Sequence, residues 1–481
     1  MSEAKHYTTA PEDRISISQK LVYGIGGLVN NLLGAAVGCM AIVLNLGLGM
    51  NPAVVGMLMA LPRLTDALTD PIMGYISDNT RSRFGRRRPY IFFGAIFSGI
   101  IFAIMWQLRA GNSQTFYFWY FLIASIIFYL AYTVYATPWV ALGYELTPDY
   151  HERTRLMGVS NWIGQFAWVI APWFYKIMEN DKWFASSVEG ARGLAIMVGV
   201  FVIAAGVLPA IFCRERFCSH SCDDGKKAVK ISGLWENMVS FLKGFIITLK
   251  SRPFLKLCTA TFLVFNGFML VSAFSSYVII YYIFGGDRDA GATYMGWFGT
   301  VSSIATFCVI PLITWVSTKI GKRKAFMLST SISIVGYAMK WFCYNPDSPR
   351  MLLIPAPFIA FGLGGLFTLM GAMMADVCDI DEVETGERRE GMYGSIYWWM
   401  VKLGMALAFA ISGYLLNATG FKVELAGNQT VRTLYLLRVF DIIVPIITSA
   451  IAVFIIFTFR VTEEKAYQVR LKLEKRRGKR T

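Results

Sequence analysis

Long runs of apolar residues alternate with short polar stretches along the whole of this 481-residue chain. The runs are about 18 to 29 residues long, and a helix of about 20 residues crosses the hydrocarbon core of a bilayer. The pattern therefore predicts about twelve membrane-spanning helices. The predicted spans are residues 21–49, 52–78, 90–108, 115–144, 157–178, 191–212, 254–284, 293–317, 325–343, 351–376, 392–417 and 432–460.

These runs are apolar on every side, whereas the strands of a membrane β-barrel alternate apolar and polar residues. The composition agrees, because 55% of the residues are hydrophobic and only 16% are charged. Soluble domains have about 45–50% apolar and about 25% charged residues. We therefore expect an all-α membrane protein rather than a soluble one.

Basic residues are concentrated in a few polar stretches, and this sets the expected orientation. The net charge is +15, with clusters at 81–88, 214–256 and 319–324 and in the tail after residue 460. If successive spans cross the membrane in opposite directions, all four basic clusters lie on the same side of it. The positive-inside rule assigns that side to the cytoplasm. We expect an inner cell-membrane protein with both termini in the cytoplasm. Topology and contact with anionic lipid account for the charge, so no nucleic-acid partner is expected.

Two motifs recur at one separation along the chain. The stretch 83–88 (RFGRRR) matches 319–324 (KIGKRK) at an offset of 236 (319 minus 83), and Arg153 matches Arg389 at the same offset. The longest polar stretch lies between the halves. Two six-helix halves related by an axis along the membrane normal are typical of the major facilitator fold, in which the substrate site lies near the midplane between them.

This repeat predicts four regions. They are an N-terminal six-helix half (1–212), a cytoplasmic middle loop (213–252), a C-terminal six-helix half (253–460) and a basic cytoplasmic tail (461–481).

Arg86 and Arg87 of the basic turn are expected to control the rocking of the two halves by pairing with cytoplasmic acids. The alternative is that the turn only sets topology. The candidate acids are Glu145, Asp149, Asp376, Asp379 and Asp381.

The second predicted helix carries three charges, Arg63, Asp66 and Asp70. At 100° per residue, Arg63 and Asp70 fall within about 20° of one another, with Asp66 about 60° to the side. A central charge costs at least about 2.5–3.5 kcal/mol in a membrane, so the three need a polar cavity. Asp66 and Asp70 are our candidate ligands for a coupling cation, held together by Arg63. A structural ion network is the alternative.

Two lysines lie in predicted helices of the second half. Lys402 sits about ten residues inside its span, which is deep for snorkelling, and we expect it to be a counter-charge near the carboxylates and the solute. Lys340 is nearer a helix end, and we assign it to snorkelling.

Amides and aromatics in the same helices are typical of sugar recognition, in which rings stack on a pyranose and amides bind its hydroxyls. Helix packing or an interfacial belt is the alternative for any one aromatic residue. The candidate solute contacts, together with Arg63 and Lys402, are Asn30, Asn31, Tyr132, Trp139, Asn161, Gln165 and Tyr397.

No enzyme signature competes with transport. The three histidines are His6, His151 and His220, all in predicted loops or tails, which excludes a histidine-based triad within the membrane. There is no Walker sequence to drive transport with ATP. We expect no organic cofactor, and the energy has to come from an ion gradient.

The chain resembles the glycoside-pentoside-hexuronide:cation symporters, and the likeness spans essentially its whole length. The most specific motif is Arg63 to Gly74 (RLTDALTDPIMG), followed by 80–91 (TRSRFGRRRPYI). Further matches are 23–26 (YGIG), 375–379 (ADVCD) and 397–404 (YWWMVKLG).

The resemblance implies a binding site for Na⁺, H⁺ or Li⁺ at Asp66 and Asp70, helped by Thr133 of the fourth helix, with Lys402 near both sites. The sugar site departs from melibiose-type members, which have Lys-Asp where this chain has Asn30-Asn31. They also have an aspartate in place of Ala136, with the tryptophan one place from Trp139. An α-galactoside is therefore doubtful, and a uronide or another anionic sugar fits the remaining positive charge better.

We thus expect a monomeric secondary transporter that couples a sugar-like solute to Na⁺ or H⁺. A cation-coupled carrier of a lipid-like or other amphiphilic solute is an alternative, favoured by an apolar cleft open to the bilayer. A non-transporting membrane sensor and a membrane-embedded enzyme are the alternatives from other classes.

Overall fold

The computed structural model describes residues 13–80, 82–147, 150–215, 251–385 and 390–461, with 464–466, 468–469 and 472 of the tail. Within these ranges the chain is helical, without strands. Each of the twelve predicted spans coincides with one helix or with a run of consecutive short helices. Asp149, most of the middle loop and most of the basic tail lie outside the described residues.

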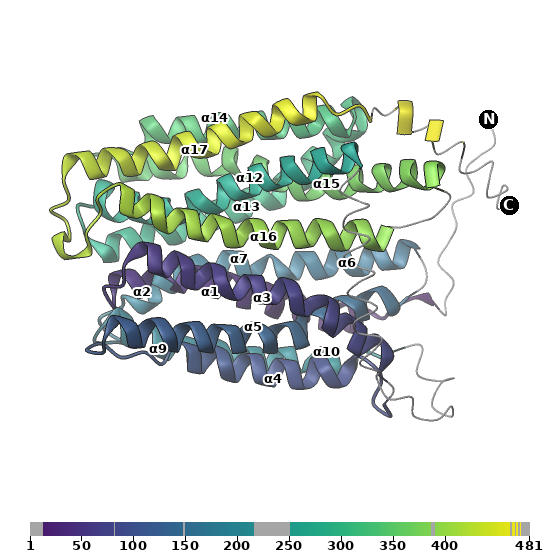
Figure 1. The fold of residues 1–481 in the computed structure, drawn as a ribbon, viewed down its shortest axis with the longest axis horizontal. Helices are drawn as coiled ribbons and strands as arrows, with labels where there is room; N and C mark the ends of the chain where they lie inside the picture. The colour runs from purple at the N-terminus through teal and green to yellow at the C-terminus, as the bar shows by residue number, and fades with distance from the viewer. Residues whose placement is uncertain are drawn as a thin grey trace. The chain divides into compact units, whose positions relative to one another are not determined.

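Some of the first six spans are interrupted (Figure 1). The first span is a helix that is broken near its end, and the fifth is made of four consecutive pieces. The helices are α1 (Ile17–Met40), α2 (Ile42–Leu46), α3 (Pro52–Asn79), α4 (Arg88–Met105), α5 (Gln114–Glu145), α6 (Tyr150–Gly164), α7 (Phe166–Ile170), η2 (Ala171–Trp173), α8 (Phe174–Met178), α9 (Ser187–Gly206) and α10 (Leu208–Phe212).

The second six spans are longer and less interrupted, apart from a π-helix in the seventh. The elements are α12 (Arg252–Tyr277), the π-helix η4 (Val278–Ile283), α13 (Arg288–Ile320), α14 (Lys322–Cys343), η5 (Pro349–Leu353), α15 (Pro355–Thr385), α16 (Glu390–Ala418), η6 (Val423–Leu425) and α17 (Val431–Phe457).

Helix starts follow local capping chemistry. The side chains of Ser113, Ser186 and Asp287 accept hydrogen bonds from backbone N–H groups three residues later, at 3.2, 3.3 and 3.0 Å. Such oxygens satisfy donors that a helix leaves without partners at its first turn. Gly85 and Gly321, at matching places in the repeat, both have positive φ, of 105° and 84°. This backbone conformation explains why glycine stands at both positions.

Nine helices of the described ranges are long and apolar enough to cross a membrane by length and composition alone. The predicted spans that miss this standard are α3, the broken run α6 to α8, and α14. The charges of α3 and α14 lower their mean hydropathy. Their polar groups must therefore be satisfied by the protein itself.

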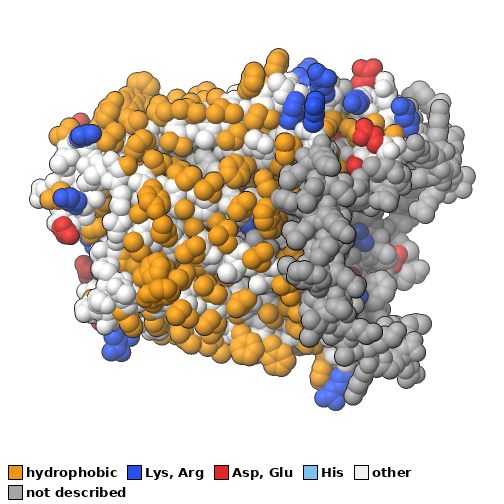
Figure 2. Space-filling model, in the orientation of Figure 1, with side chains coloured by type: hydrophobic (Ala, Val, Ile, Leu, Met, Phe, Trp, Pro, Cys, Tyr) orange, Lys and Arg blue, Asp and Glu red, His pale blue; other side chains and the backbone are white. Residues whose placement is uncertain are grey.

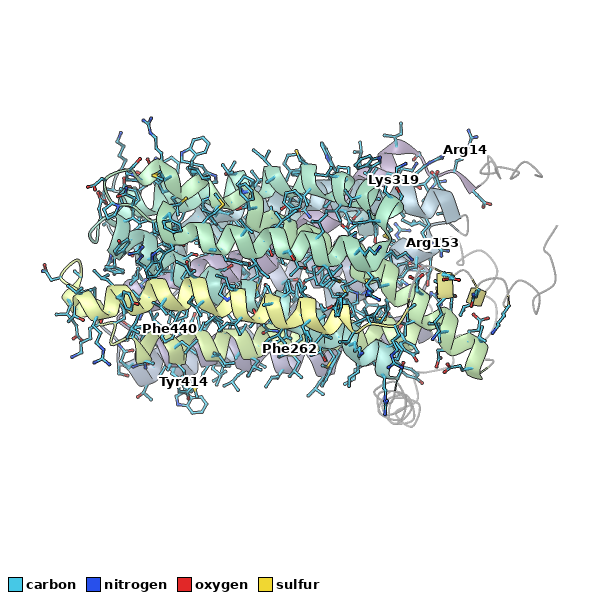
Figure 3. All side chains as sticks on the ribbon, turned by 90° about the horizontal axis from the view of Figure 1, so that it is seen from above. Arg14, Arg153, Phe262, Lys319, Tyr414 and Phe440 are labelled. Carbon is cyan, nitrogen blue, oxygen red and sulfur yellow. The ribbon has the colours of Figure 1, made fainter. Side chains whose placement is uncertain are left out.

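Large apolar side chains are exposed along the helices, as expected of surfaces that meet lipid. Phe93 and Phe97 of α4 and Phe454 of α17 are examples. Figure 2 shows apolar side chains over the middle lengths of the helices, with Lys and Arg gathered near helix ends. In the first unit, Arg14 and Arg153 lie at the same end (Figure 3). This distribution suits an integral membrane protein.

The chain forms two compact units. One contains residues up to 43 and from 65 to 238, and the other contains 44–64 and the residues from 239 on. In the first unit α4 packs on α5 and α9, and α1 packs on α6. In the second, α12 packs on α16 and α17, and α14 on α15. The second unit has an apolar core around Phe254, Phe326, Leu366 and Ile396.

Residues 44–64 come from the first six spans, yet they pack in the second unit. Tyr277 Oη donates to Asn45 Oδ1 at 2.9 Å, and Asn417 Nδ2 donates to Asn51 Oδ1 at 2.7 Å. A Cβ at Gly56 would lie 2.5 Å from the carbonyl oxygen of Phe409 on α16. Glycine is what allows this close backbone approach.

The assignment of Lys340 to snorkelling is wrong. Its side chain does not reach water, because the residue is only 1% exposed. Its ammonium group forms a salt bridge with Asp441 of α17 at 3.0 Å. A partner inside the protein removes the need to reach the interface, and proximity to a helix end could not reveal that partner.

Candidate cation and solute site

The two carboxylates of α3 face two threonines of α5. Thr133 Oγ1 lies 2.8 Å from Asp66 Oδ1 and 3.2 Å from Asp70 Oδ1, and Thr137 Oγ1 donates to Asp70 Oδ1 at 3.1 Å. Asp66 is 1% exposed and Asp70 is half-buried. Because both pairs are spaced four residues apart, each lies on one face of its helix, and the two faces meet.

The cluster is richer in hydroxyls than the sequence indicated. Thr69 Oγ1 lies 3.2 Å from Thr133 Oγ1. Thr69 and Thr137 were missed by the sequence analysis, although their spacing from Asp66 and Thr133 could have drawn attention to them. Together the side chains make a compact set of oxygen atoms inside a membrane-spanning helix pair.

This arrangement fits a small hard cation or a proton. Carboxylate and hydroxyl oxygens are the ligands that such cations prefer. A threonine hydroxyl has one proton, so Thr133 can donate to only one of its two carboxylates at a time. Within the described residues no group of three or more His, Cys, Asp or Glu could hold a metal.

Arg63 stands one helical turn before Asp66 but belongs to the second unit. It is 8% exposed, and its Nη1 lies 3.9 Å from Met405 Sδ on α16. Lys402 is half-buried three residues before Met405, and side chains three apart are neighbours on a helix. The second unit thus presents two cationic side chains around one stretch of α16.

The candidate solute amides lie in the first unit, in or beside α1. Tyr132 Oη donates to Asn30 Oδ1 at 2.9 Å, and Asn31 Nδ2 donates to the Gly164 carbonyl at 3.2 Å. Both asparagines are half-buried, and each keeps further hydrogen-bonding capacity. They remain suitable for contact with a polar solute.

Other candidates have different surroundings. Trp139 is buried, stacks on Tyr23 at 5.0 Å and donates its only N–H to the Tyr23 carbonyl at 3.2 Å. Tyr397 is buried in the core of the second unit and accepts from Thr261 at 3.4 Å. Asn161 is exposed, and Gln165 is half-buried where α6 gives way to α7. The structure thus brings Tyr132 and Asn30 of this set into direct contact.

The basic turn of the first unit contacts acids of that unit. Arg86 and Arg87 both pair with Glu145, and Arg87 Nη2 also lies 2.6 Å from Asp78 Oδ1. Burial alone would lower the pKa of Arg86, but the hydrogen bond to Glu145 and nearby acids raise it, which keeps the guanidinium charged. In the second unit Lys322 pairs with Asp376 at 2.7 Å, while Asp379 is half-buried on α15.

Glu215 completes the basic turn and was missed by the sequence analysis. Its carboxylate accepts from the backbone N–H groups of Arg86, Arg87 and Arg88, at 2.8, 2.9 and 2.8 Å. It therefore caps the start of α4, where a helix carries positive partial charge. A glutamate 127 residues from Arg88 gives no local signal in the sequence.

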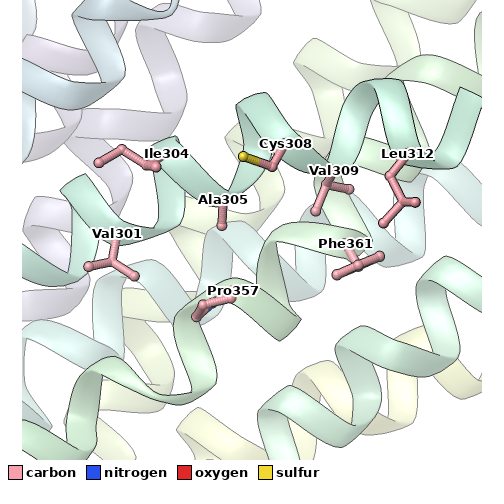
Figure 4. A pocket seen from close by; sticks show the side chains of 8 residues that line it. All are labelled: Val301, Ile304, Ala305, Cys308, Val309, Leu312, Pro357 and Phe361. Carbon is pink, nitrogen blue, oxygen red and sulfur yellow. The ribbon is translucent and has the colours of Figure 1, made fainter.

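An apolar groove runs between α13 and α15 of the second unit (Figure 4). It has a volume of about 400 Å³. The lining residues are Val301, Ile304, Ala305, Cys308, Val309, Leu312, Pro357 and Phe361. A groove without polar lining suits a hydrocarbon chain rather than a sugar.

Comparisons with known proteins place the chain in a family. Residues 22–463 match the model of the MFS/sugar transport protein family. The chain is 24% identical to a glucuronide carrier protein homolog of Escherichia coli over 89% of both chains. It is also 24% identical to sodium-dependent lysophosphatidylcholine symporter 1-B of Danio rerio, over 96% of this chain and 90% of that one.

Among solved structures, the fold resembles that of a bacterial homolog of the human lysosomal transporter Spinster, in an inward-facing, unoccupied conformation. The TM-score is 0.65 at 16% identity, covering 97% of this chain and 99% of that one. This likeness shows the fold alone. The helical architecture and the match over 22–463 lead to one conclusion. The chain belongs to the MFS/sugar transport protein family and is a membrane transporter with the major facilitator fold.

Proposed function

We propose that the protein is a symporter that couples an anionic, sugar-like solute to Na⁺ or H⁺. The observation that carries the proposal is the cluster of Asp66, Asp70 and Thr133, whose oxygens converge inside the membrane-spanning part of the fold. Buried carboxylates need compensating positive charge. A bound cation, Na⁺, Li⁺ or H⁺, contributes it for part of the transport cycle.

The positive side chains favour an anionic solute. Arg63 and Lys402 lie on helices that carry the candidate sites. Asn31 and Ala136 stand where melibiose-type carriers have aspartates, and Asn30 stands where they have a lysine. A carboxylate or sulfate on the sugar pairs with a guanidinium more favourably than a hydroxyl does. The likeness to a glucuronide carrier homolog supports this class.

Alternating access supplies the mechanism. The two six-helix halves, 1–212 and 253–460, rock about the site, with both termini in the cytoplasm. The ion pairs of Arg86 and Arg87 with Glu145, and of Lys322 with Asp376, stabilise one arrangement of the cytoplasmic loops. They are our proposed gating contacts.

An amphiphilic solute is a second candidate function. The apolar groove between α13 and α15 would accept an acyl chain, and relatives are named lysophosphatidylcholine symporters. A carrier of such a lipid would use the same cation site. The groove is the observation that separates the two proposals.

Uptake into proteoliposomes tests both. A glucuronide, its neutral glucoside and a lysophospholipid are offered under an imposed Na⁺ or pH gradient. We expect accumulation of the glucuronide, lost in Asp70→Asn and kept in the control Asp347→Asn, an exposed loop acid. Accumulation of the lysophospholipid alone would favour the second candidate. If none of these solutes shows counterflow, the result would favour the non-transporting membrane sensor instead.

A further inference from the structure

A second buried charge cluster lies in the second unit, on α12, α14 and α17. Lys340 of α14 is 1% exposed and Asp441 of α17 is 0% exposed, and their charged groups are 3.0 Å apart. Asp441 also accepts from Ser275 Oγ of α12 at 2.8 Å and from Tyr344 Oη at 2.5 Å. Lys340 Nζ donates to Ser275 Oγ at 2.9 Å. Three helices therefore meet at one carboxylate.

Stability alone is a weak reason for such a cluster. Taking two ions out of water costs several kcal/mol each, and well-packed apolar residues often serve as well or better. Ionisable residues within membrane helices more often mark ion or proton pathways. The site is too closed for a solute, and the Lys340 ammonium occupies the position beside Asp441 that a metal cation would need. A proton is the ligand that fits.

The backbone around the cluster is irregular on two sides. α12 ends at Tyr277 and continues as a π-helix over Val278–Ile283, which begins three residues after Ser275. In α17, Pro445 has no N–H to donate to the carbonyl of Asp441 four residues earlier. Prolines and π-helical segments are places where helices bend, and π-helical segments are frequent at functional sites.

We propose that Lys340, Asp441, Ser275 and Tyr344 form a proton-binding site of the second unit, separate from the cluster of Asp66, Asp70 and Thr133. A proton from water adds to a carboxylate oxygen of Asp441 and gives the neutral acid. The net charge of the cluster changes from zero to +1. A lone ammonium is costly in a dry interior, so the protonated state requires helix movement that admits water.

Other polar groups face this site. Lys340 Nζ lies 5.9 Å from the Tyr337 ring and 5.6 Å from the Tyr344 ring. Arg438 stands one turn before Asp441 and donates to Tyr282 Oη at 2.7 Å. Arg438 therefore adds a further positive charge to the surroundings of the cluster.

The site is connected to residues 44–64. Ser275 stands two residues before Tyr277, whose hydroxyl donates to Asn45 Oδ1 at 2.9 Å. Movement of the end of α12 would therefore disturb this contact. Protonation of Asp441 is thereby linked to the packing of a segment that comes from the first six spans.

Infrared spectroscopy of the full-length protein in nanodiscs tests the proposal. We expect a carboxylic C=O band to appear reversibly as the pH is lowered from about 8 to 5. The part of the band that comes from Asp441 should be lost in Asp441→Asn and kept in Asp70→Asn. If no band appears, or if Asp441→Asn leaves the intensity of the band unchanged, Asp441 stays ionised and the proposal is overturned.

A paired variant keeps the test usable if Asp441→Asn fails to fold. Lys340→Met with Asp441→Leu removes both charges together, which buried pairs often tolerate. We expect this variant to fold and to lack the part of the carboxylic C=O band that comes from Asp441. Its melting temperature should change less with pH than that of the wild type. Equal pH dependence in the two proteins would contradict the proposal.

Discussion

At the scale of single residues, Thr133 is the most informative position. It is fully buried, and its hydroxyl lies within hydrogen-bonding distance of both Asp66 and Asp70. Its single proton can be donated to only one of the two carboxylates at a time. Replacing Thr133, which we propose as a ligand of the coupling cation, should affect ion binding more than folding.

We predict that Thr133→Val weakens activation of uptake by the coupling cation. The substitution keeps the shape of the side chain and removes its oxygen. Hydrogen bonds to charged groups contribute about 1.5–3 kcal/mol, so the half-saturating cation concentration should rise by about ten- to a hundredfold. The control is Thr306→Val, since Thr306 bonds only within its own helix, to Ser302 O. Equal cation dependence in both variants would remove Thr133 from the site.

At the scale of elements, helix contacts depend on small residues and on anchored ends. α3 crosses α16 through Gly56 and Gly413, and a Cβ at Gly413 would lie 2.4 Å from the Pro52 carbonyl oxygen. The start of α1 is held to α6 by Glu152, which pairs with Lys20 at 2.6 Å and accepts from Ile15 N at 3.0 Å. Each contact can be tested by one substitution.

Gly413→Ala should destabilise the protein. The added methyl group would overlap the backbone of Pro52, and overpacking costs about 1–3 kcal/mol. Thermal unfolding in detergent measures the effect. Gly371→Ala on α15 is the matched control, because no heavy atom lies within 4 Å of its added Cβ and alanine favours helix. A melting temperature equal to that of Gly371→Ala would show that α3 and α16 do not pack tightly at Gly413.

The anchor at Glu152 should depend on pH. Burial alone would raise the pKa of Glu152, but hydrogen bonds from Lys20 and Ile15 outweigh it and hold the pKa below the ordinary value. A lowered folded-state pKa stabilises the fold above the unfolded pKa of about 4.3, and the stabilisation is lost as the pH falls through the folded value. Glu152→Gln should therefore lower the melting temperature at pH 7, with the difference shrinking toward pH 3. A difference independent of pH would contradict this account.

At the scale of the whole molecule, the duplicated chain carries one basic turn per unit, and the two turns have different surroundings. In the first unit Arg87 is buried and shares Glu145 with Arg86. In the second, Lys322 is 41% exposed and forms its ion pair with Asp376. Since exposed ion pairs contribute little, the first contact should matter more.

Glu145→Gln should therefore destabilise the protein by about 1–3 kcal/mol, because Arg86 and the buried Arg87 lose the carboxylate they share while Arg87 keeps Asp78. Asp376→Asn should cost less than about 1 kcal/mol. Chemical unfolding of both variants in the same detergent gives the comparison. Equal effects would mean that exposure does not decide the strength of these contacts.

The sequence by itself determined the twelve spans, because a helix that crosses a bilayer must satisfy its own backbone and be apolar over about 20 residues. It also determined that Asp66, Asp70 and Arg63 share one helix, because helical periodicity is local. The repeated motif placed a glycine at both positions 85 and 321, and both glycines have positive φ. These features depend on neighbours in the chain.

Only the tertiary structure decided which distant groups meet. Glu215 caps α4 from 127 residues away, Thr137 joins the cluster through packing of α5 on α3, and Asp441 pairs with Lys340, 101 residues earlier. Trp139, a candidate solute contact, stacks on Tyr23 of another helix, which a local pattern does not predict. A periodic pattern fixes the face on which a residue lies, but which helix covers that face depends on packing of the whole unit.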